Sequence, residues 1–302
     1  MQSNNILIAG GTGLIGARLT EMLLAKGHTV RLLTRSPKGP DQYFWNPSAG
    51  EMDLAALKDV DIVINLAGAG IADGRWTAAR KKELVESRVQ SAGILFREIE
   101  QMHKRPKAFL SASAIGIYGN SGESWMREGS VPADQSFMVD CCQQWESSAD
   151  QITQLGLRVV KFRIGVVMAK TGGALAEVVK PLRFGLGVYF GNGQAWWSWI
   201  HRDDVCGAFI WAIENRGIEG VFNLVAPMPT RGKDLVTSTA KAMKQPAIFL
   251  SAPATVLRMF LGEMSAVILN SNRVSSEKLT QAGFKFHFPV LDAALHDIFA
   301  SQ

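Results

Sequence analysis

Ile6-Leu-Ile-Ala-Gly-Gly-Thr-Gly-Leu-Ile-Gly16, near the start of the chain, places an apolar run directly before three regularly spaced glycines. Residues 17–24 follow with the apolar spacing that is typical of a helix. A buried strand that turns through glycines into a helix points backbone N–H groups at a gap, where the helix dipole favours an anion. A second strand-like run at residues 29–34 completes a βαβ unit. The stretch therefore predicts a site for a dinucleotide pyrophosphate, with a purely structural turn as the alternative.

The end of the second predicted strand bears on the choice of cofactor. Thr34 and Arg35 end this strand and Lys38 follows, whereas the first acidic residue, Asp41, lies beyond it. An NAD site usually places a carboxylate there for the ribose hydroxyls, and a 2′-phosphate favours cations instead. Arg18 in the first turn of the helix adds positive charge. We expect NADP(H) to be preferred, with NAD(H) as an alternative, unless Arg35 is simply a solvated residue.

Length and composition limit the classes of protein that fit. The 302 residues, of which 47% are hydrophobic, suffice for one large domain or for a domain with a smaller lobe. Only three cysteines occur, two of them adjacent, and no apolar run is long enough to span a bilayer. The first strand begins too early for a signal peptide. We therefore expect a cytoplasmic protein without disulfides, a metal site or a membrane partner.

The net charge of +5 is modest and its basic residues are dispersed. This distribution suits a small anionic ligand better than nucleic acid. The sequence does not predict an oligomeric state.

Strand and helix patterns alternate through the first two thirds of the chain. The predicted strands after the second are 42–46, 60–67, 107–112, 158–165 and 220–225. The predicted helices are 77–102 with a break near Gly93, 137–155, one from Asp203 and one after Arg231. From residue 246 short helices with loops are expected. The alternation predicts an α/β fold, with a Rossmann-type doubly wound parallel sheet and a smaller C-terminal substrate lobe.

We expect residues 1–170 to form the NADP-binding domain, with segments near 203–225 returning to it, and 171–302 to form mainly the lobe and a C-terminal helical module. Ligands in such sheets bind beyond the carboxyl ends of the strands. The loops after the predicted strands should therefore surround one cleft.

Several motifs together resemble the extended short-chain dehydrogenase/reductases: Gly10–Gly16, Asn65-Leu-Ala-Gly68, Ser111-Ala-Ser113, Tyr118-Gly119 and Trp199-Ile-His-Arg-Asp-Asp-Val205. More closely, the chain resembles an atypical branch of the NAD(P)-dependent epimerase/dehydratase-like proteins, the sugar-nucleotide epimerase-like branch with an extra C-terminal module. The residues that carry this closer likeness are Arg75-Trp76, Ser87-Arg-Val89, Leu261-Gly-Glu-Met264, Lys278-Leu279, Gly283-Phe284 and Phe288-Pro289. The likeness covers nearly the whole chain.

The resemblance implies a Tyr-x-x-x-Lys pair, in which the lysine lowers the pKa of the tyrosine and the tyrosine passes the proton. The chain has three tyrosines, and none has a lysine four positions later. Where the family places the pair stand Phe137 and Cys141, which supply neither a phenol nor an ammonium group. Ser113 matches the family serine that hydrogen-bonds the reacting oxygen, although a serine at a strand end also satisfies backbone groups.

Two further residues are candidates for proton transfer. Tyr118 lies close enough in sequence to act as an alternative acid, and His201 either titrates in the cleft or hydrogen-bonds the helix start beside it. We interpret Cys141 as a small helix residue that faces the core, with an activated thiol near the helix N-terminus as the alternative. Glu146 and Asp140 of the same helix are interpreted as solvated or capping groups. The predicted catalytic residues are Ser113, Tyr118 and His201.

Other residues enter the cofactor site through the resemblance. It implies that the helix face with Glu83 and Arg88 borders the cofactor and that Arg88 reaches a phosphate, unless the two form an ordinary ion pair. The predicted cofactor-binding residues are Gly10, Thr12, Gly13, Leu14, Ile15, Gly16, Thr34, Arg35, Leu66, Ala67, Gly68, Glu83, Arg88 and Val167.

The cluster Gly191-Asn-Gly-Gln-Ala-Trp-Trp-Ser-Trp199 is either a substrate-pocket wall for a ring-bearing polar ligand or packing between parts of the lobe. The favoured interpretation of the whole chain is an NADP(H)-binding oxidoreductase or epimerase-like enzyme that acts on an alcohol or carbonyl of a polar ligand such as a sugar nucleotide. The alternative is a non-catalytic NADP(H)-binding redox sensor or scaffold, because the Tyr-x-x-x-Lys pair is absent.

Overall fold

The computed structural model describes residues 3–300. Its contacts divide the chain into two units. Unit 1 takes in the residues up to Ser113 together with 140–162 and 206–222, and unit 2 takes in 114–139, 163–205 and the residues from Asn223 onward. The segment 206–222 thus belongs with the N-terminal sheet, whereas 114–139 and 163–170 group with the C-terminal lobe.

An eight-stranded sheet is built on the first strands of the chain, in the order β13-β8-β6-β5-β1-β2-β3-β4. Its strands are β1 (Asn5–Ala9), β2 (Thr29–Thr34), β3 (Gln42–Asn46), β4 (Glu51–Met52), β5 (Ile62–Asn65), β6 (Ala108–Ala114), β8 (Arg158–Ile164) and β13 (Gly220–Leu224). The pairs β1–β2, β1–β5, β5–β6 and β2–β3 are parallel, and β4 runs antiparallel to β3. The predicted Rossmann-type parallel sheet is therefore confirmed.

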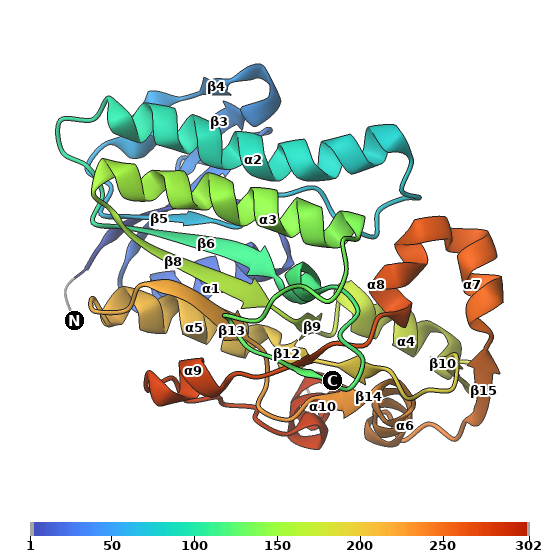
Figure 1. Cartoon of the computed structure of the whole chain (residues 1–302). Coiled ribbons are helices and arrows are strands. Elements are labelled where there is room, and N and C mark those ends of the chain that lie inside the picture. The colour runs from blue at the N-terminus through green and yellow to red at the C-terminus, as the bar shows by residue number, and fades with distance from the viewer. Residues whose placement is uncertain (1–2, 301–302) are drawn as a thin grey trace. The chain divides into compact units, whose positions relative to one another are not determined.

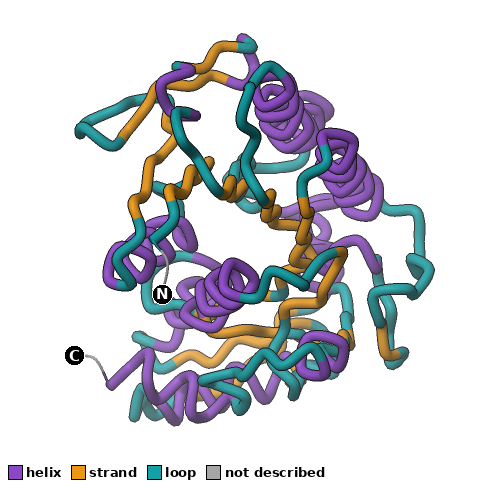
Figure 2. Tube along the Cα trace, turned by 90° about the vertical axis from the view of Figure 1, so that its left-hand side faces the viewer, coloured by secondary structure: helices purple, strands orange, loops and turns teal. Residues whose placement is uncertain are grey.

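Helices cover both faces of this sheet. Helices α2 (Ala78–Glu100) and α3 (Phe137–Asp150) lie side by side on one face, and α1 (Leu14–Ala25) and α5 (Arg202–Glu214) lie on the other (Figures 1 and 2). A cluster that includes Leu7, Leu95, Phe109 and Ile152 fills the layer beneath α2 and α3. Strands β1 and β5 are almost wholly buried, because a parallel sheet with helices on both faces leaves no strand face to water.

Three predicted boundaries differ from the structure. Helix α2 runs unbroken through Gly93. A Cβ added at Gly93 would have no atom within 4 Å, so no close contact requires a glycine or a break there. Helix α3 ends at Asp150 and continues as a 3₁₀ turn (Gln151–Leu155). The region expected to contain only short helices begins with a strand, β15 (Ile248–Ala252), that pairs with β10 (Leu186–Phe190).

Unit 2 is assembled from small elements around Trp199, Met168, Leu235 and Leu295. The strands besides β10 and β15 are β7 (Trp125–Met126), β9 (Val166–Met168), β11 (Trp196–Trp197), β12 (Trp199–His201), β14 (Thr230–Arg231) and β16 (Arg273–Val274). The helices are α4 (Gly173–Leu182), α6 (Gly232–Ala242), α7 (Ala254–Leu261), α8 (Ala266–Leu269), α9 (Glu277–Gln281) and α10 (Leu291–Ala300).

Among the described residues, no helix combines the length and the apolar character that crossing a bilayer requires.

Candidate functional site

The glycine turn after β1 is shaped by close backbone approach. Gly10 has φ +80°, and a Cβ there would lie 2.8 Å from the backbone of Leu66. A Cβ at Gly16 would lie 2.3 Å from the carbonyl oxygen of Gly10. Only glycine fits these two positions, because the turn, the loop after β5 and the start of α1 pass within contact distance of one another.

The start of α1 is open to an anion. Its N-cap residue is Gly13, no side chain accepts a hydrogen bond from the first turn, and that turn contains no acidic residue. Gly13 is exposed and has an ordinary φ of −77°. The first N–H groups of a helix have no intrahelical acceptor, so a phosphate placed here would meet donors without a competing carboxylate.

The loop after β5 lies beside this turn at the carboxyl edge of the sheet, because Ala9 of β1 is paired with Asn65 of β5. The side chain of Asn65 is fully buried; its Oδ1 accepts from the N–H of Ala67, and its Nδ2 donates to Ser91 Oγ at 3.1 Å. The N–H of Ala69 donates to Ser87 Oγ. Helix α2 therefore holds the backbone of the predicted cofactor residues Leu66, Ala67 and Gly68 in place.

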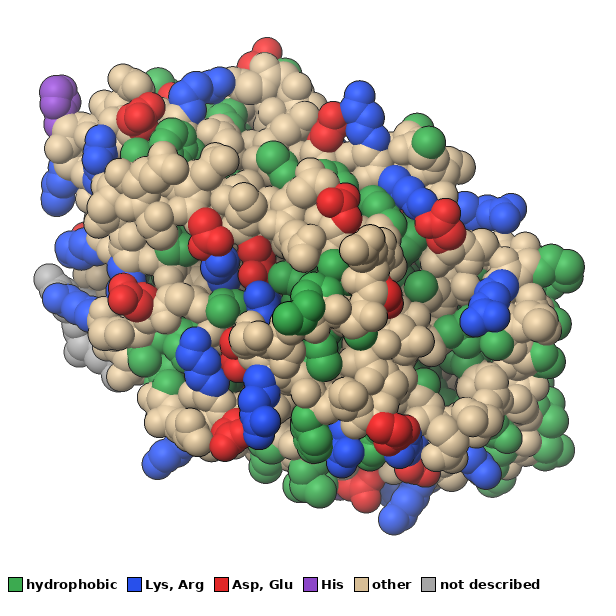
Figure 3. Space-filling view, in the orientation of Figure 1, with side chains coloured by type: hydrophobic (Ala, Val, Ile, Leu, Met, Phe, Trp, Pro, Cys, Tyr) green, Lys and Arg blue, Asp and Glu red, His purple; other side chains and the backbone are tan. Residues whose placement is uncertain are grey.

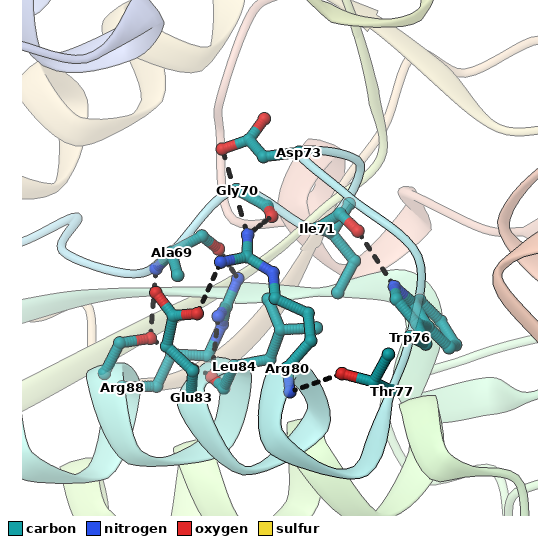
Figure 4. Close-up of polar contacts among 11 residues, drawn as sticks. Ala69, Gly70, Ile71, Asp73, Trp76, Thr77, Arg80, Glu83, Leu84 and Arg88 are labelled. Atoms are coloured by element: carbon teal, nitrogen blue, oxygen red, sulfur yellow. Dashed lines mark hydrogen bonds and ion pairs between the residues drawn. The ribbon is translucent and has the colours of Figure 1, made fainter.

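Arg80 ties the next part of this loop to α2 (Figure 4). Its Nη1 donates to Glu83 at 2.6 Å, and its Nη2 donates to the carbonyl oxygen of Gly70 at 2.5 Å. Asp73 lies 3.9 Å from the same guanidinium. Glu83, a predicted cofactor residue, thus pairs with Arg80, and its side chain is 58% exposed.

Arg88 is partly buried and bonds to the loop. Its Nη1 donates to Leu84 O at 2.8 Å and its Nη2 donates to Ala69 O at 3.1 Å (Figure 4). Its guanidinium lies 4.8 Å from the ring centroid of Trp145. Burial lowers the pKa of this arginine. The alternative of a surface pair between Glu83 and Arg88 is wrong, because each of these side chains has other partners. The predicted phosphate contact of Arg88 stays a prediction.

Ser113 has a partner that sequence reasoning did not assign to it. Its Oγ donates to Glu146 Oε1 at 2.7 Å, and both side chains are buried. Lys161 of β8 lies 3.8 Å from Glu146 Oε2, and Lys161 Nζ also donates to the half-exposed Asp150 at 2.7 Å. The interpretation of Glu146 as a solvated or capping group is therefore wrong, because the apolar face of α3 turns it toward the sheet.

Tyr118 belongs to a buried polar network of unit 2. Its hydroxyl donates to Asn223 Oδ1 at 2.6 Å and accepts from Arg163 Nη1 at 2.9 Å. Burial raises the pKa of Tyr118 above its ordinary value, and Arg163 opposes that shift. The phenol is only 1% exposed and is committed to these bonds, which is a poor arrangement for a proton donor.

His201 caps the helix that follows it. Its Nδ1 accepts from the backbone N–H of Asp203 at 3.1 Å, and its Nε2 lies 3.4 Å from Asp297. Burial lowers the pKa of His201, while the carboxylates of Asp203 and Asp297 oppose the shift. Two roles are predicted for His201 from the sequence, titration in the cleft and a hydrogen bond to the helix start. The structure shows the hydrogen bond.

The remaining predicted residues lie apart from such networks. Thr34 Oγ1 accepts from the N–H of Ser36, and Arg35 is exposed at the end of β2. Val167 lies in β9 of unit 2, where it is paired with Ile200.

The geometry can now be compared with known proteins. The NAD dependent epimerase/dehydratase family matches residues 6–224, and a domain of unknown function, DUF1731, matches residues 252–298. The chain belongs to the NAD-dependent epimerase/dehydratase family. The epimerase family protein YfhF of Bacillus subtilis is 35% identical over 302 residues, 99% of each chain. The resemblance found in the sequence is confirmed, including its C-terminal module.

Two solved structures that are described as epimerases or epimerase family proteins are similar to this chain. The human epimerase family protein SDR39U1 (isoform 2), solved with NADPH, gives a TM-score of 0.89 at 30% identity and covers 99% of this chain and 100% of its own. The nucleoside-diphosphate sugar epimerase of Corynebacterium glutamicum gives 0.80 at 28% identity, covering 100% of this chain and 59% of its own.

This epimerase/dehydratase-family chain departs from the expected catalytic pair at both positions of α3. Phe137 begins the helix, and Cys141 is buried with its thiol close enough to Arg88 for the guanidinium to oppose the rise in thiol pKa that burial causes. A high thiol pKa keeps Cys141 protonated and unreactive. The interpretation of Cys141 as a core residue therefore fits its surroundings.

Sequence reasoning missed two residues of the family member's buried network, Glu146 and Lys161. A signal for Glu146 was present, because Cys142, Glu146 and Ala149 have the helical spacing of one face and the other two are apolar. Lys161 interrupts an apolar strand, and its partners Glu146 and Asp150 both lie on α3. No pattern in the sequence indicates this contact, because only the fold brings α3 close to β8.

Proposed function

We propose that this chain is an NADP(H)-binding oxidoreductase or epimerase-like enzyme of the extended short-chain dehydrogenase/reductase type, acting on an alcohol or carbonyl group. The observation that carries the proposal is the uncapped start of α1 behind a turn with no room for side chains at Gly10 and Gly16. These features suit a pyrophosphate, and the NADPH bound to the human relative supports the same cofactor. Arg35 is the residue we assign to the 2′-phosphate.

The bound nicotinamide would supply or accept a hydride. The chain itself then has to handle one proton, and the tyrosine that usually does so is absent. Ser113 is the residue we assign to the reacting oxygen: its hydroxyl hydrogen is donated to Glu146, which leaves its oxygen to accept a hydrogen bond from a substrate alcohol. The substrate that the sequence suggests is a polar ligand such as a sugar nucleotide.

A binding measurement on a single glycine tests the cofactor. In Gly13→Ala the new Cβ lies 3.4 Å from Gly10 O, which is ordinary contact, yet it stands where a phosphate would approach. We expect Gly13→Ala to lose NADPH affinity by about tenfold or more, equivalent to about 1.4 kcal/mol. Gly93→Ala, in open space on α2, is the matched control and should bind as wild type. Equal affinity in all three proteins would contradict the assignment.

One observation favours the second candidate, a redox sensor or scaffold that binds NADP(H) without turnover. Tyr118 is locked in hydrogen bonds and Phe137 and Cys141 carry no suitable acid, so no tyrosine–lysine pair is formed. A screen of alcohols and carbonyl compounds with wild type and Ser113→Ala separates the two functions. Turnover that falls in Ser113→Ala indicates an enzyme, and bound cofactor without turnover of any compound indicates a sensor.

A further inference from the structure

Unit 2 contains a cavity of about 170 Å³ between β10 and the helices α4, α6, α7 and α8. We call it the α7 cavity. Most of its wall is apolar, and the apolar side chains that line it include those of Val178, Phe190, Leu235, Val236, Ile268 and Leu269. Figure 3 shows hydrophobic side chains gathered on the surface over α7 and β15, next to this cavity.

Four of the residues that line the α7 cavity have polar side chains, and each of these side chains can donate a hydrogen bond. They are Arg258, Trp197, Asn192 and Tyr189. Asn192 turns its Oδ1 to the N–H of Gln194, which leaves its amide hydrogens for a ligand. Within residues 3–300, Arg258 has neither an ion pair nor a hydrogen bond, and no carboxylate lines the cavity.

The charged residues near the cavity add to its positive character. Lys233 Nζ lies 5.6 Å from the ring centroid of Tyr189, which brings a second cation close to the cavity. Arg231, by contrast, is neutralised, because it donates to both carboxylate oxygens of Glu123 at 2.7 and 2.9 Å. Arg258 is therefore the cation left for an anionic ligand on the wall of the cavity.

We propose that the α7 cavity binds an apolar monocarboxylate, with the hydrocarbon part among the aliphatic side chains and the carboxylate on Arg258. A lining with one cation and no carboxylate favours an anionic ligand, and one exposed guanidinium suits a single carboxylate. The inference rests on the proposed function in taking this ligand as the part of the substrate that unit 2 recognises, and for that part it replaces the suggested sugar nucleotide with an apolar acid.

The volume of the cavity suits about one ring for the part of a ligand that enters it. An apolar cavity of about 150 Å³ holds benzene, whereas drug-sized ligands need about 300–1,000 Å³. A nucleoside diphosphate would exceed that space, and its two phosphates would compete for one lining arginine. The predicted indole wall is also smaller than the sequence suggested: Trp197 lines the cavity, but Trp199 is buried with its Nε1 bonded to Met228 O, and Trp196 donates to Glu123.

Cinnamate, a single ring with one carboxylate, is the probe, and cinnamyl alcohol is its neutral counterpart. Binding is measured by ligand-observed NMR up to millimolar concentration, without cofactor, for wild type, Arg258→Gln and Arg183→Gln. Arg183 is an exposed arginine at the end of α4 that does not line the cavity, so its variant is the matched charge control. We expect cinnamate to bind about tenfold more weakly to Arg258→Gln, and equally to wild type and Arg183→Gln.

A second variant, Ala254→Phe, adds a ring at a residue that lines the cavity and should abolish cinnamate binding while far-UV circular dichroism stays unchanged. The proposal is overturned if cinnamate fails to bind wild type, if it binds Arg258→Gln equally well, or if UDP-glucose binds in its place with the same dependence on Arg258. NADPH affinity is measured on the same samples. If wild type fails to bind NADPH but binds cinnamate, only the proposed function is refuted. If wild type binds NADPH but fails to bind cinnamate, only this inference is refuted.

Discussion

Lys161 and Glu146 are two charged side chains in the interior of unit 1, each less than a tenth exposed. They are tolerated because each has the other as a counter-charge, and because Ser113 and Asp150 take the remaining hydrogen bonds. A buried pair of this kind contributes little net stability, but removal of one partner leaves an uncompensated charge.

We therefore expect Lys161→Met to lower the free energy of unfolding by about 3–5 kcal/mol, since it strands the carboxylate of Glu146. Asp150→Asn, which removes only the half-exposed partner, should cost about 1 kcal/mol or less. Urea unfolding of both variants measures the difference. The double variant Lys161→Met/Glu146→Leu should recover part of the loss, and an equal cost for the two single variants would contradict this account.

Arg35 gives the second expectation at the scale of single residues. Arg35→Ala should weaken NADPH binding by about tenfold, because a charge-assisted bond to the 2′-phosphate is lost. NADH affinity should stay within error, since NADH carries no such phosphate. Fluorescence titration at low salt measures both affinities, with Lys285→Ala as a control for the loss of one exposed positive charge. A parallel fall for the two cofactors would remove Arg35 from the site.

At the scale of elements, helix starts are the features that organise both units. Helix α1 begins at a bare glycine, which leaves its N–H groups for a ligand. Helix α5 begins beside His201, whose unprotonated Nδ1 accepts the N–H of Asp203. Ser113, whose hydroxyl donates to Glu146, is the second-last residue of strand β6. The first N–H groups of α1 therefore have no side-chain acceptor, whereas an N–H at the start of α5 is bonded to His201.

The cap of α5 should make stability depend on pH. Burial lowers the pKa of His201 below its ordinary 6.5 in the folded chain, so the unfolded chain binds the proton more tightly. The stabilisation is then complete above about pH 6.5 and is lost as pH falls toward the folded pKa. His28, whose pKa is also lowered by burial, adds to the same trend.

We expect the free energy of unfolding to fall between about pH 7.5 and pH 5.5, and to fall less in His201→Asn, whose amide oxygen can still cap α5. Chemical denaturation at the two pH values tests this. His103→Asn, at an exposed histidine, should keep the wild-type dependence. A greater loss in His201→Asn than in wild type would reverse the sign that burial implies.

At the scale of the whole molecule, a cofactor that binds only the folded chain must stabilise it. NADPH at about 100 times its Kd should add about 2.7 kcal/mol, which is a rise of several degrees in Tm for a chain of this size. Thermal unfolding monitored with and without NADPH measures the shift. Gly13→Ala should show almost none at the same concentration, while Gly93→Ala should match wild type. A shift that is the same in Gly13→Ala would place the cofactor elsewhere.

The sequence by itself determined the parallel sheet, the glycine turn and the family, because each follows from local periodicity or from glycines that permit close backbone contact. It also placed Ser113 at a strand end and showed that the tyrosine–lysine pair is missing. These properties depend on residues that are close together in the sequence.

Only the tertiary structure decided the partners of the polar side chains. Glu146 meets Ser113 across 33 positions of sequence, and Tyr118 meets Asn223 across 105. Arg88 turned out to hold the backbone of Ala69, and Arg258 to line a cavity built from six separate elements. Burial and pairing depend on which segments the fold brings together, and no local pattern records that.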